Sequence, residues 1–190
     1  MGTGRLHDVG STGGGGPTAR LGAEGHTAQV DSSGTRDRDR NGTVRNARPR
    51  DELGRPLPYG SVGVPRQQEG IHRTPAQTVR EAQQLLDTGF PFHAHEVFED
   101  AWKLTTGDGR ELWKALAQFA VGVTHLARGN GRGAAALLRR SSEALRRLQD
   151  DPPYGIDVIG VCDWSTGVLA ALPERPPGTP VPPPPRLLAE

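Results

Sequence analysis

The residues best suited to chemistry lie in one short segment in the middle of the chain, between Phe90 and Trp102. If this segment is helical, His95, Glu99 and Trp102 follow at spacings of four and three residues and share one face. An imidazole and a carboxylate placed in this way can act as an acid/base pair or as two ligands of a metal ion. Glu96, next to His95, offers a second carboxylate.

A second polar stripe follows in the next predicted helix, where Gln118, Gly122 and His125 lie four and three residues apart. Gly122 has no side chain and would let a neighbouring helix approach closely. A partly buried histidine and carboxylate need polar partners. We therefore predict that Gln118 and His125 face His95 and Glu99. The candidate residues are His95, Glu96, Glu99, Trp102, Gln118 and His125.

Three interpretations of this cluster are open. The first is structural: a hydrogen-bonded network, capped by the Trp102 indole, that fixes how two helices dock. The second is a divalent metal site built from His95, Glu99 and His125, a donor set like that of catalytic zinc sites. The third is an acid/base enzyme in which Glu96 or Glu99 serves as the base.

Two features of the sequence weigh against particular kinds of enzyme, a zinc protease and one that forms a covalent intermediate. Glu99 stands where the zinc-protease motif His-Glu-x-x-His has its second histidine. No serine or cysteine occupies a setting that would make it a nucleophile. His93 lies about 200° around the helix from His95, so we expect it to be exposed or near the helix N-terminus.

The helices that must position these residues can be predicted from apolar periodicity and end signals. Thr74 and Pro75 are a typical N-cap and first helical residue. Five apolar residues repeat at spacings of four and three, which indicates a buried helical face. They are Leu112, Leu116, Phe119, Val123 and Leu126. The predicted helices span 75–88, 91–104, 110–128, 132–149 and 156–172, the last with Asp157 as a candidate cap. Short connections favour a compact all-α bundle of about five helices.

Composition sets the limits of this domain. The chain has 26 glycines and 17 prolines, and 15 of the glycines precede Ile71 while eight of the prolines follow Leu172. We predict a disordered Gly/Arg/Asp-rich tail at 1–70, a helical domain at 71–172 and a proline-rich tail at 173–190. Residues 181–186 favour the extended polyproline II conformation, either solvated or as a ligand for a proline-recognising module.

Charge, cysteine content and hydropathy narrow the partners. Residues 72–172 carry eleven basic and twelve acidic side chains, which argues against a dedicated nucleic-acid surface. The single cysteine, Cys162, excludes an internal disulfide and favours a small buried residue. Residues 115–127 form the longest apolar stretch, which is too short to span a bilayer. Without a recognisable signal peptide, we expect a cytoplasmic protein. The three Trp and four Phe residues would favour a homodimer if some of them form an apolar patch.

Three motifs in order resemble the bacterial domain-of-unknown-function family 309. They are residues 95–102 (HEVFEDAW), 116–125 (LAQFAVGVTH) and 128–134 (RGNGRGA). The resemblance covers about residues 75–172 and implies a compact helical bundle without an established activity. It marks the six candidate residues as matching positions but gives them no roles. We therefore expect a non-enzymatic interaction or scaffold module of unknown partner, with a metal-dependent or acid/base hydrolase-like enzyme as the alternative.

Overall fold

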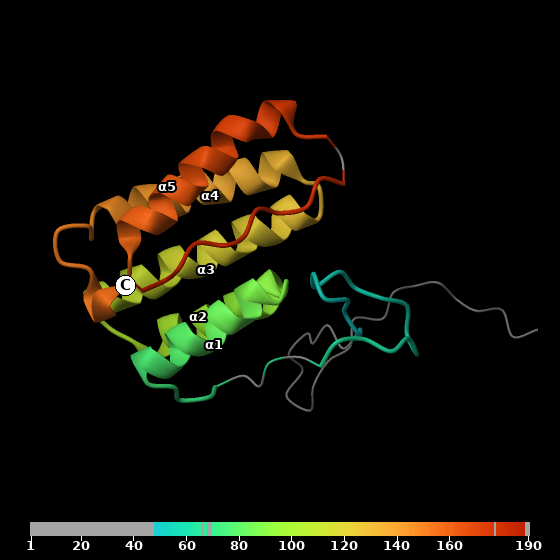
Figure 1. Ribbon diagram of the computed structural model, residues 1–190. Coiled ribbons are helices and arrows are strands. Elements are labelled where there is room, and N and C mark those ends of the chain that lie inside the picture. Colours follow the sequence, from blue (N-terminus) through green and yellow to red (C-terminus); the bar gives the residue numbers. More distant parts are fainter. Residues whose placement is uncertain (1–47, 66, 68–69, 177, 189–190) are drawn as a thin grey trace, which may run out of the picture. The chain divides into compact units, whose positions relative to one another are not determined.

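The protein is an all-α bundle, as predicted. The computed structural model describes residues 48–65, 67, 70–176 and 178–188, and no strand forms among them. Two short 3-10 turns lie at Pro153–Gly155 and Leu172–Glu174. The helices are α1 (Pro75–Asp87), α2 (Pro91–Leu104), α3 (Asp108–Ala127), α4 (Gly131–Arg146) and α5 (Val158–Ala171) (Figure 1). Their bounds differ from the predicted bounds by at most three residues.

Side-chain caps explain where α1 and α5 begin. Thr74 accepts a hydrogen bond from the Gln77 backbone N–H, and the Gln77 side chain accepts one from the Thr74 backbone N–H at 2.8 Å. This reciprocal pair is a capping box, which satisfies two N–H groups that would otherwise lack partners. Asp157 caps α5 through the Gly160 N–H at 2.8 Å. Thr74 and Asp157 are the caps that the sequence predicts.

Helix α3 forms the centre of the bundle. It lies between α2 on one side and α4 on the other, with α1 packed on α2 and α5 packed on α4 (Figure 1). A Cβ atom on Gly122 would lie 2.9 Å from Leu138 Cδ2 of α4, so this glycine permits the close approach of the two helices. The predicted apolar stripe of α3 is buried along its whole length: Leu112, Leu116, Phe119, Val123 and Leu126.

A loop before the first helix packs on the bundle. The sequence predicts a tail up to residue 70, but residues 48–65 form turns, and Leu53 O accepts hydrogen bonds from the Arg128 guanidinium at the end of α3. Gly54, at φ +75°, lies against the Phe92 ring so closely that a Cβ atom would overlap it. The compact unit therefore begins upstream of the predicted boundary. The disorder predicted for residues 1–47 lies outside the described residues.

A buried ion pair attaches the entry to α1. Arg73 donates to both carboxylate oxygens of Glu81 at 2.7 and 3.0 Å and to Asp100 Oδ2 of α2 at 3.3 Å. Asp100 Oδ1 accepts from the Gly70 N–H at 3.3 Å. The side chains of Arg73 and Asp100 are each 9% exposed. These groups join the residues that precede α1 to both α1 and α2.

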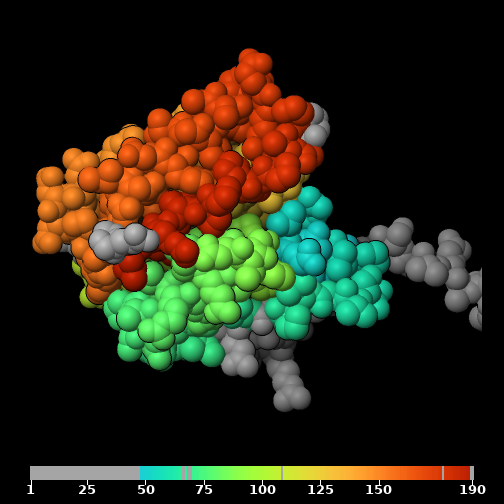
Figure 2. Space-filling view, viewed as in Figure 1, coloured from blue at the N-terminus to red at the C-terminus, as the bar shows by residue number. Residues whose placement is uncertain are grey.

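The proline-rich tail also packs on the bundle instead of being solvated. Leu187 is fully buried, its carbonyl accepts from the Asp157 N–H at 2.9 Å, and Ile156 and Leu188 form an isolated bridge. Figure 1 shows the tail running along α3, and Figure 2 shows it lying in the furrow between α1 and α5. The bundle thus has an additional, non-helical layer. Within the described residues, no helix combines the length and apolar character that a membrane crossing requires.

The buried Arg73–Asp100 pair leads to a stability prediction. We expect Asp100→Ala to lower the free energy of unfolding by about 3 kcal/mol, because it leaves the Gly70 N–H without its acceptor and removes one of the two carboxylates paired with Arg73. Urea unfolding followed by circular dichroism measures the change. The control Asp163→Ala removes an exposed carboxylate of α5 and should change stability by less than about 0.5 kcal/mol. Equal losses in the two variants would contradict a specific role for the buried pair.

Candidate functional site

On the polar face of α2, the predicted residues His95 and Glu99 and their neighbour Lys103 form a short chain of contacts. His95 Nε2 lies 3.6 Å from Glu99 Oε2, and Lys103 Nζ lies 3.1 Å from Glu99 Oε1. Burial lowers the pKa of His95, against the opposing effect of the Glu99 charge, and Lys103 lowers it further. The imidazole is therefore neutral at pH 7 and its contact with Glu99 is not a full ion pair. Glu96 is half-buried on the same helix.

Trp102 contacts a cation instead of capping a network. The Arg110 guanidinium lies over the indole ring, with Cζ 5.0 Å from the ring centroid, and Arg110 Nη1 donates to Trp102 O at 2.6 Å. The indole nitrogen is buried and has no hydrogen-bond partner. The structural interpretation expected this indole to close the polar cluster, and the contacts show a cation–π pair between α2 and α3.

The second predicted stripe contacts α4. His125 Nδ1 lies 2.9 Å from Asn130 Nδ2, in the turn before α4, and a Cβ atom on Gly133 would approach the same His125 nitrogen. Burial lowers the pKa of His125, and the charge of Arg128 lowers it further. Gln118 lies half-buried on α3. Among the described residues, neither Gln118 nor His125 forms a hydrogen bond or an ion pair with His95 or Glu99.

The contacts therefore divide the predicted cluster into two groups. The stripe on α3 turns toward α4, because Gly122 packs against Leu138, whereas the stripe on α2 forms its own contacts with Lys103 and Arg110. The residues that the structure describes contain no group of three or more His, Cys, Asp or Glu side chains placed to hold a metal ion. The set His95, Glu99 and His125 accordingly does not form such a group.

His93 is buried at the start of α2. It is 4% exposed, and its ring contacts the rings of Phe90 and Phe92 edge-on at centroid distances of 5.6 and 5.8 Å. Burial lowers its pKa, weakly opposed by the backbone of Pro65. We expected His93 to be exposed or near the helix N-terminus. It lies near the N-terminus of α2 and is not exposed. Aromatic packing from both flanking phenylalanines explains the burial.

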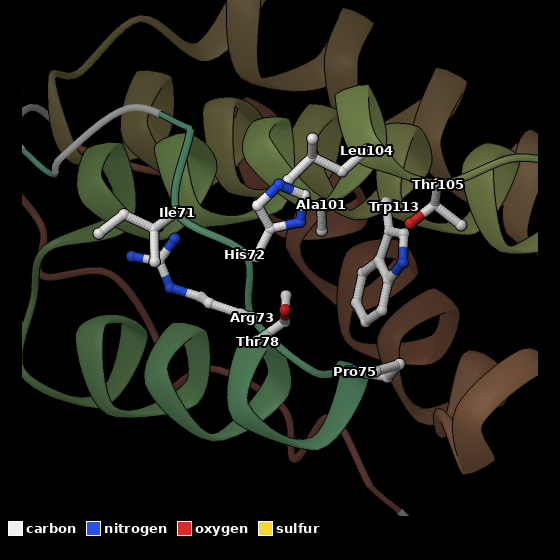
Figure 3. Close-up of a pocket in the computed structure, with 9 residues that line it drawn as sticks. All are labelled: Ile71, His72, Arg73, Pro75, Thr78, Ala101, Leu104, Thr105 and Trp113. Carbon is white, nitrogen blue, oxygen red and sulfur yellow. The ribbon is translucent and has the colours of Figure 1, made fainter.

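A small hollow lies beside the buried ion pair, between the residues that precede α1 and the helices α1, α2 and α3 (Figure 3). Its volume of about 130 Å³ would hold roughly four water molecules. The charged lining residue Arg73 is already paired with Glu81 and Asp100, and in Figure 3 it extends away from the Trp113 indole. None of the six candidate residues lines this hollow.

A more extended site lies where the tail crosses the bundle. Trp164 Nε1 of α5 donates to Pro183 O at 2.6 Å. From α1, Gln83 Nε2 donates to Pro185 O at 3.3 Å and Gln83 Oε1 accepts from the Leu187 N–H at 2.8 Å. Asp87 accepts from Arg186 at 3.2 Å and also from Gln83 at 2.9 Å. Trp164 and Gln83 therefore bind the main chain of the tail at Pro183, Pro185 and Leu187, and Asp87 binds the Arg186 side chain.

A hollow of about 490 Å³ lies beneath the tail, next to these contacts. Its helical lining is largely apolar and includes Val123 and Ala127 of α3 and Leu86 of α1. Trp164 packs edge-on against Phe119 of α3 at a centroid distance of 5.4 Å, which fixes the indole beside the groove. We call this surface the tail groove; it is formed by Gln83, Leu86, Asp87, Val123, Ala127 and Trp164.

Part of the chain matches a known family model. Residues 79–137 match the family model described as Domain of unknown function (DUF309). All six candidate residues lie within the DUF309 match, so the resemblance inferred from the motifs is confirmed for this segment. The loop at 48–65, helix α5 and the tail lie outside it. No curated protein and no solved structure gives a match.

Sequence reasoning missed the residues of the tail groove for identifiable reasons. Gln83 and Asp87 lie on the exposed side of α1 in the sequence pattern, where polar residues need no explanation. The ring of Trp164 packs against Phe119, and nothing in the sequence indicates that its N–H binds the tail. The available signal was the pair Leu187-Leu188, which follows a run of four prolines and Arg186. Two adjacent leucines favour burial against the domain over exposure to water.

The buried histidines predict how stability depends on pH. In the unfolded chain, His93 and His95 bind protons with a pKa near 6.5, whereas burial lowers both values in the folded state. The unfolded state therefore binds more protons as pH falls through 6.5, and stability is lost until the pH is below the folded pKa values. We expect the urea midpoint to decrease between pH 7.5 and pH 5.

Substitutions identify the groups responsible for this pH dependence. His93→Gln removes one buried imidazole and should flatten the pH dependence, whatever it does to stability at pH 7.5. Phe92→Leu is the matched control: it weakens the same packing without removing a titrating group, so the slope should persist. A slope that is the same in His93→Gln and in the unsubstituted chain would show that His93 does not contribute.

Proposed function

We propose that this domain is a non-enzymatic interaction module and that the tail groove is its binding surface. The observation that carries the proposal is the hydrogen bond from the Trp164 indole to Pro183 O at 2.6 Å, made together with the Gln83 contacts to Pro185 and Leu187. The groove already binds an extended proline-rich segment of this chain, and its contacts are of a kind that another such segment could make.

The chemistry of these contacts suits a proline-rich ligand. Proline has no backbone N–H, so its carbonyl oxygen is the polar main-chain group that a partner can bind. An indole N–H on an aromatic surface is a suitable donor for such a carbonyl, and grooves lined by aromatic residues recognise polyproline II segments in several unrelated domains. Because the extended conformation is already favoured in the free peptide, binding orders fewer degrees of freedom.

One end of the ligand is held more firmly than the other. Leu187 is fully buried and has its N–H and its carbonyl both bonded, to Gln83 and to Asp157. The Arg186–Asp87 ion pair has side chains 70% and 41% exposed, so it contributes little to affinity and helps mainly with orientation. The apolar anchor therefore supplies most of the binding energy, and the main-chain contacts set direction and register.

The acid/base alternative has weaker support. It rests on His95 beside Glu99, and Lys103 already pairs with that carboxylate. The hollow beside the ion pair and the hollow beneath the tail are both lined by other residues. The contacts of His95, Glu99 and Lys103 are ordinary i,i+4 contacts along one helix, which need no substrate to explain them.

The proposal predicts binding in trans once the internal tail is displaced. Leu187→Asp in the full chain places a charge where Leu187 is buried and should release the tail. The released tail should be cleaved by trypsin after Arg186. A labelled peptide of residues 180–188 should then bind the Leu187→Asp chain, as measured by fluorescence anisotropy, and should bind the unsubstituted chain far more weakly. Failure of a folded Leu187→Asp chain to bind this peptide would refute the proposal.

Two further variants show whether binding uses the groove. Trp164→Phe, added to Leu187→Asp, removes the N–H donor while keeping the aromatic ring, and should weaken peptide binding about threefold to tenfold. Tyr59→Phe, at an exposed position in the loop at 48–65, should leave binding unchanged. Equal losses in these two variants would place the peptide elsewhere.

A further inference from the structure

The hollow beneath the tail shows that the internal segment fits its groove only in part. Leu187 fills its place completely, but a space of about 490 Å³ remains between Val181–Pro184 and the helices. A second hollow, of about 360 Å³, continues from it along Leu126, Ala127 and Leu172. Val181 lines both hollows and is half-buried.

The lining of these hollows is suited to an apolar side chain. Leu86, Pro91, Val123 and Ala127 form the apolar side of the first hollow, and Asp87 and Arg186, which pair with each other, also line it. Apolar surface that is in contact with water but faces inward gains free energy when a ligand covers it. The valine of the tail is too small to cover this lining.

We infer that the hollow is the specificity pocket of the tail groove. Its ligand is a proline-rich peptide of a partner protein that carries a large apolar side chain, such as phenylalanine, at the position held by Val181, five residues before the arginine and six before the leucine anchor. The chain's own tail is an internal competitor that holds the same register with a smaller side chain. This inference rests on the proposed function, because it requires the groove to bind peptides in trans.

The register follows from the contacts of the tail. Trp164 binds Pro183 O, and Gln83 binds on both sides of Arg186, so a peptide with the same proline spacing has its residue 181 placed over the hollow. Pro185, by contrast, borders neither hollow. A large side chain at position 181 would thus be covered by the groove, and the same side chain at position 185 would not enter the hollow.

Peptides that differ at one residue test the pocket directly. The probes are labelled peptides of residues 180–188 with Val, Phe or Ser at position 181, and a control with Phe at position 185. They are titrated into the full chain carrying Leu187→Asp. We expect the peptide with Phe at 181 to bind about tenfold more tightly than the Val peptide, the Ser peptide more weakly, and the peptide with Phe at 185 no more tightly than the Val peptide.

The outcomes separate this inference from the proposed function. Equal affinities for the Val, Phe and Ser peptides would overturn the specificity pocket while leaving peptide binding intact. An equal gain from Phe at 181 and at 185 would also overturn it, because the gain would then come from general apolarity. A folded Leu187→Asp chain that binds none of the peptides would refute the proposed function, and the inference would fail with it.

A measurement within the chain covers the case in which Leu187→Asp does not fold. Val181→Phe and Val181→Ser are introduced separately into the otherwise unchanged full chain. Filling the hollow should raise the melting temperature and protect Arg186 from trypsin, whereas the serine should lower both. If Val181→Phe instead lowers the melting temperature and exposes Arg186 to cleavage, the hollow does not accept a large apolar side chain and the inference is wrong.

Discussion

The structure depends on covering α3, which has more apolar surface than two neighbouring helices can bury. Its stripe from Leu112 to Leu126 packs between α2 and α4. Val123 and Ala127 still border the hollow that α1, α2 and the tail line. With the tail in place, Val123 is 4% exposed. The tail groove thus results from the way the other four helices surround α3. An extended segment is narrow enough to lie in the space that they leave.

The same constraint explains why the predicted polar cluster separates. Periodicity correctly assigns His95 and Glu99 to one face of α2, and Gln118, Gly122 and His125 to one face of α3. It cannot tell which neighbour a face meets. Gly122 was expected to allow a close approach and does so, but the approaching helix is α4, through Leu138. The imidazole of His125 consequently pairs with Asn130 in the turn that leads into α4.

Local signals predicted the helices to within three residues, and the starts of α1 and α5 are fixed by residues close in sequence. Thr74 with Gln77, and Asp157 with Gly160, need no tertiary information to act as caps. The segments outside the helices could not be predicted in this way. Their contacts join residues far apart in sequence, such as Arg128 with Leu53 and Trp164 with Pro183, and a composition rich in glycine or proline gives no sign of such partners.

A tethered ligand can occupy a groove without fitting it well. The tail leaves α5 near residue 172 and reaches its first groove contact at Pro183, so a short connection holds it close to the groove. Short flexible linkers give effective concentrations on the order of millimolar. A segment with modest intrinsic affinity therefore remains bound, and an unfilled hollow beneath Val181 costs it little occupancy. A partner peptide at micromolar concentration has no such advantage. It must compensate with contacts that the tail lacks, and the hollow is the place in the groove where such contacts remain to be made.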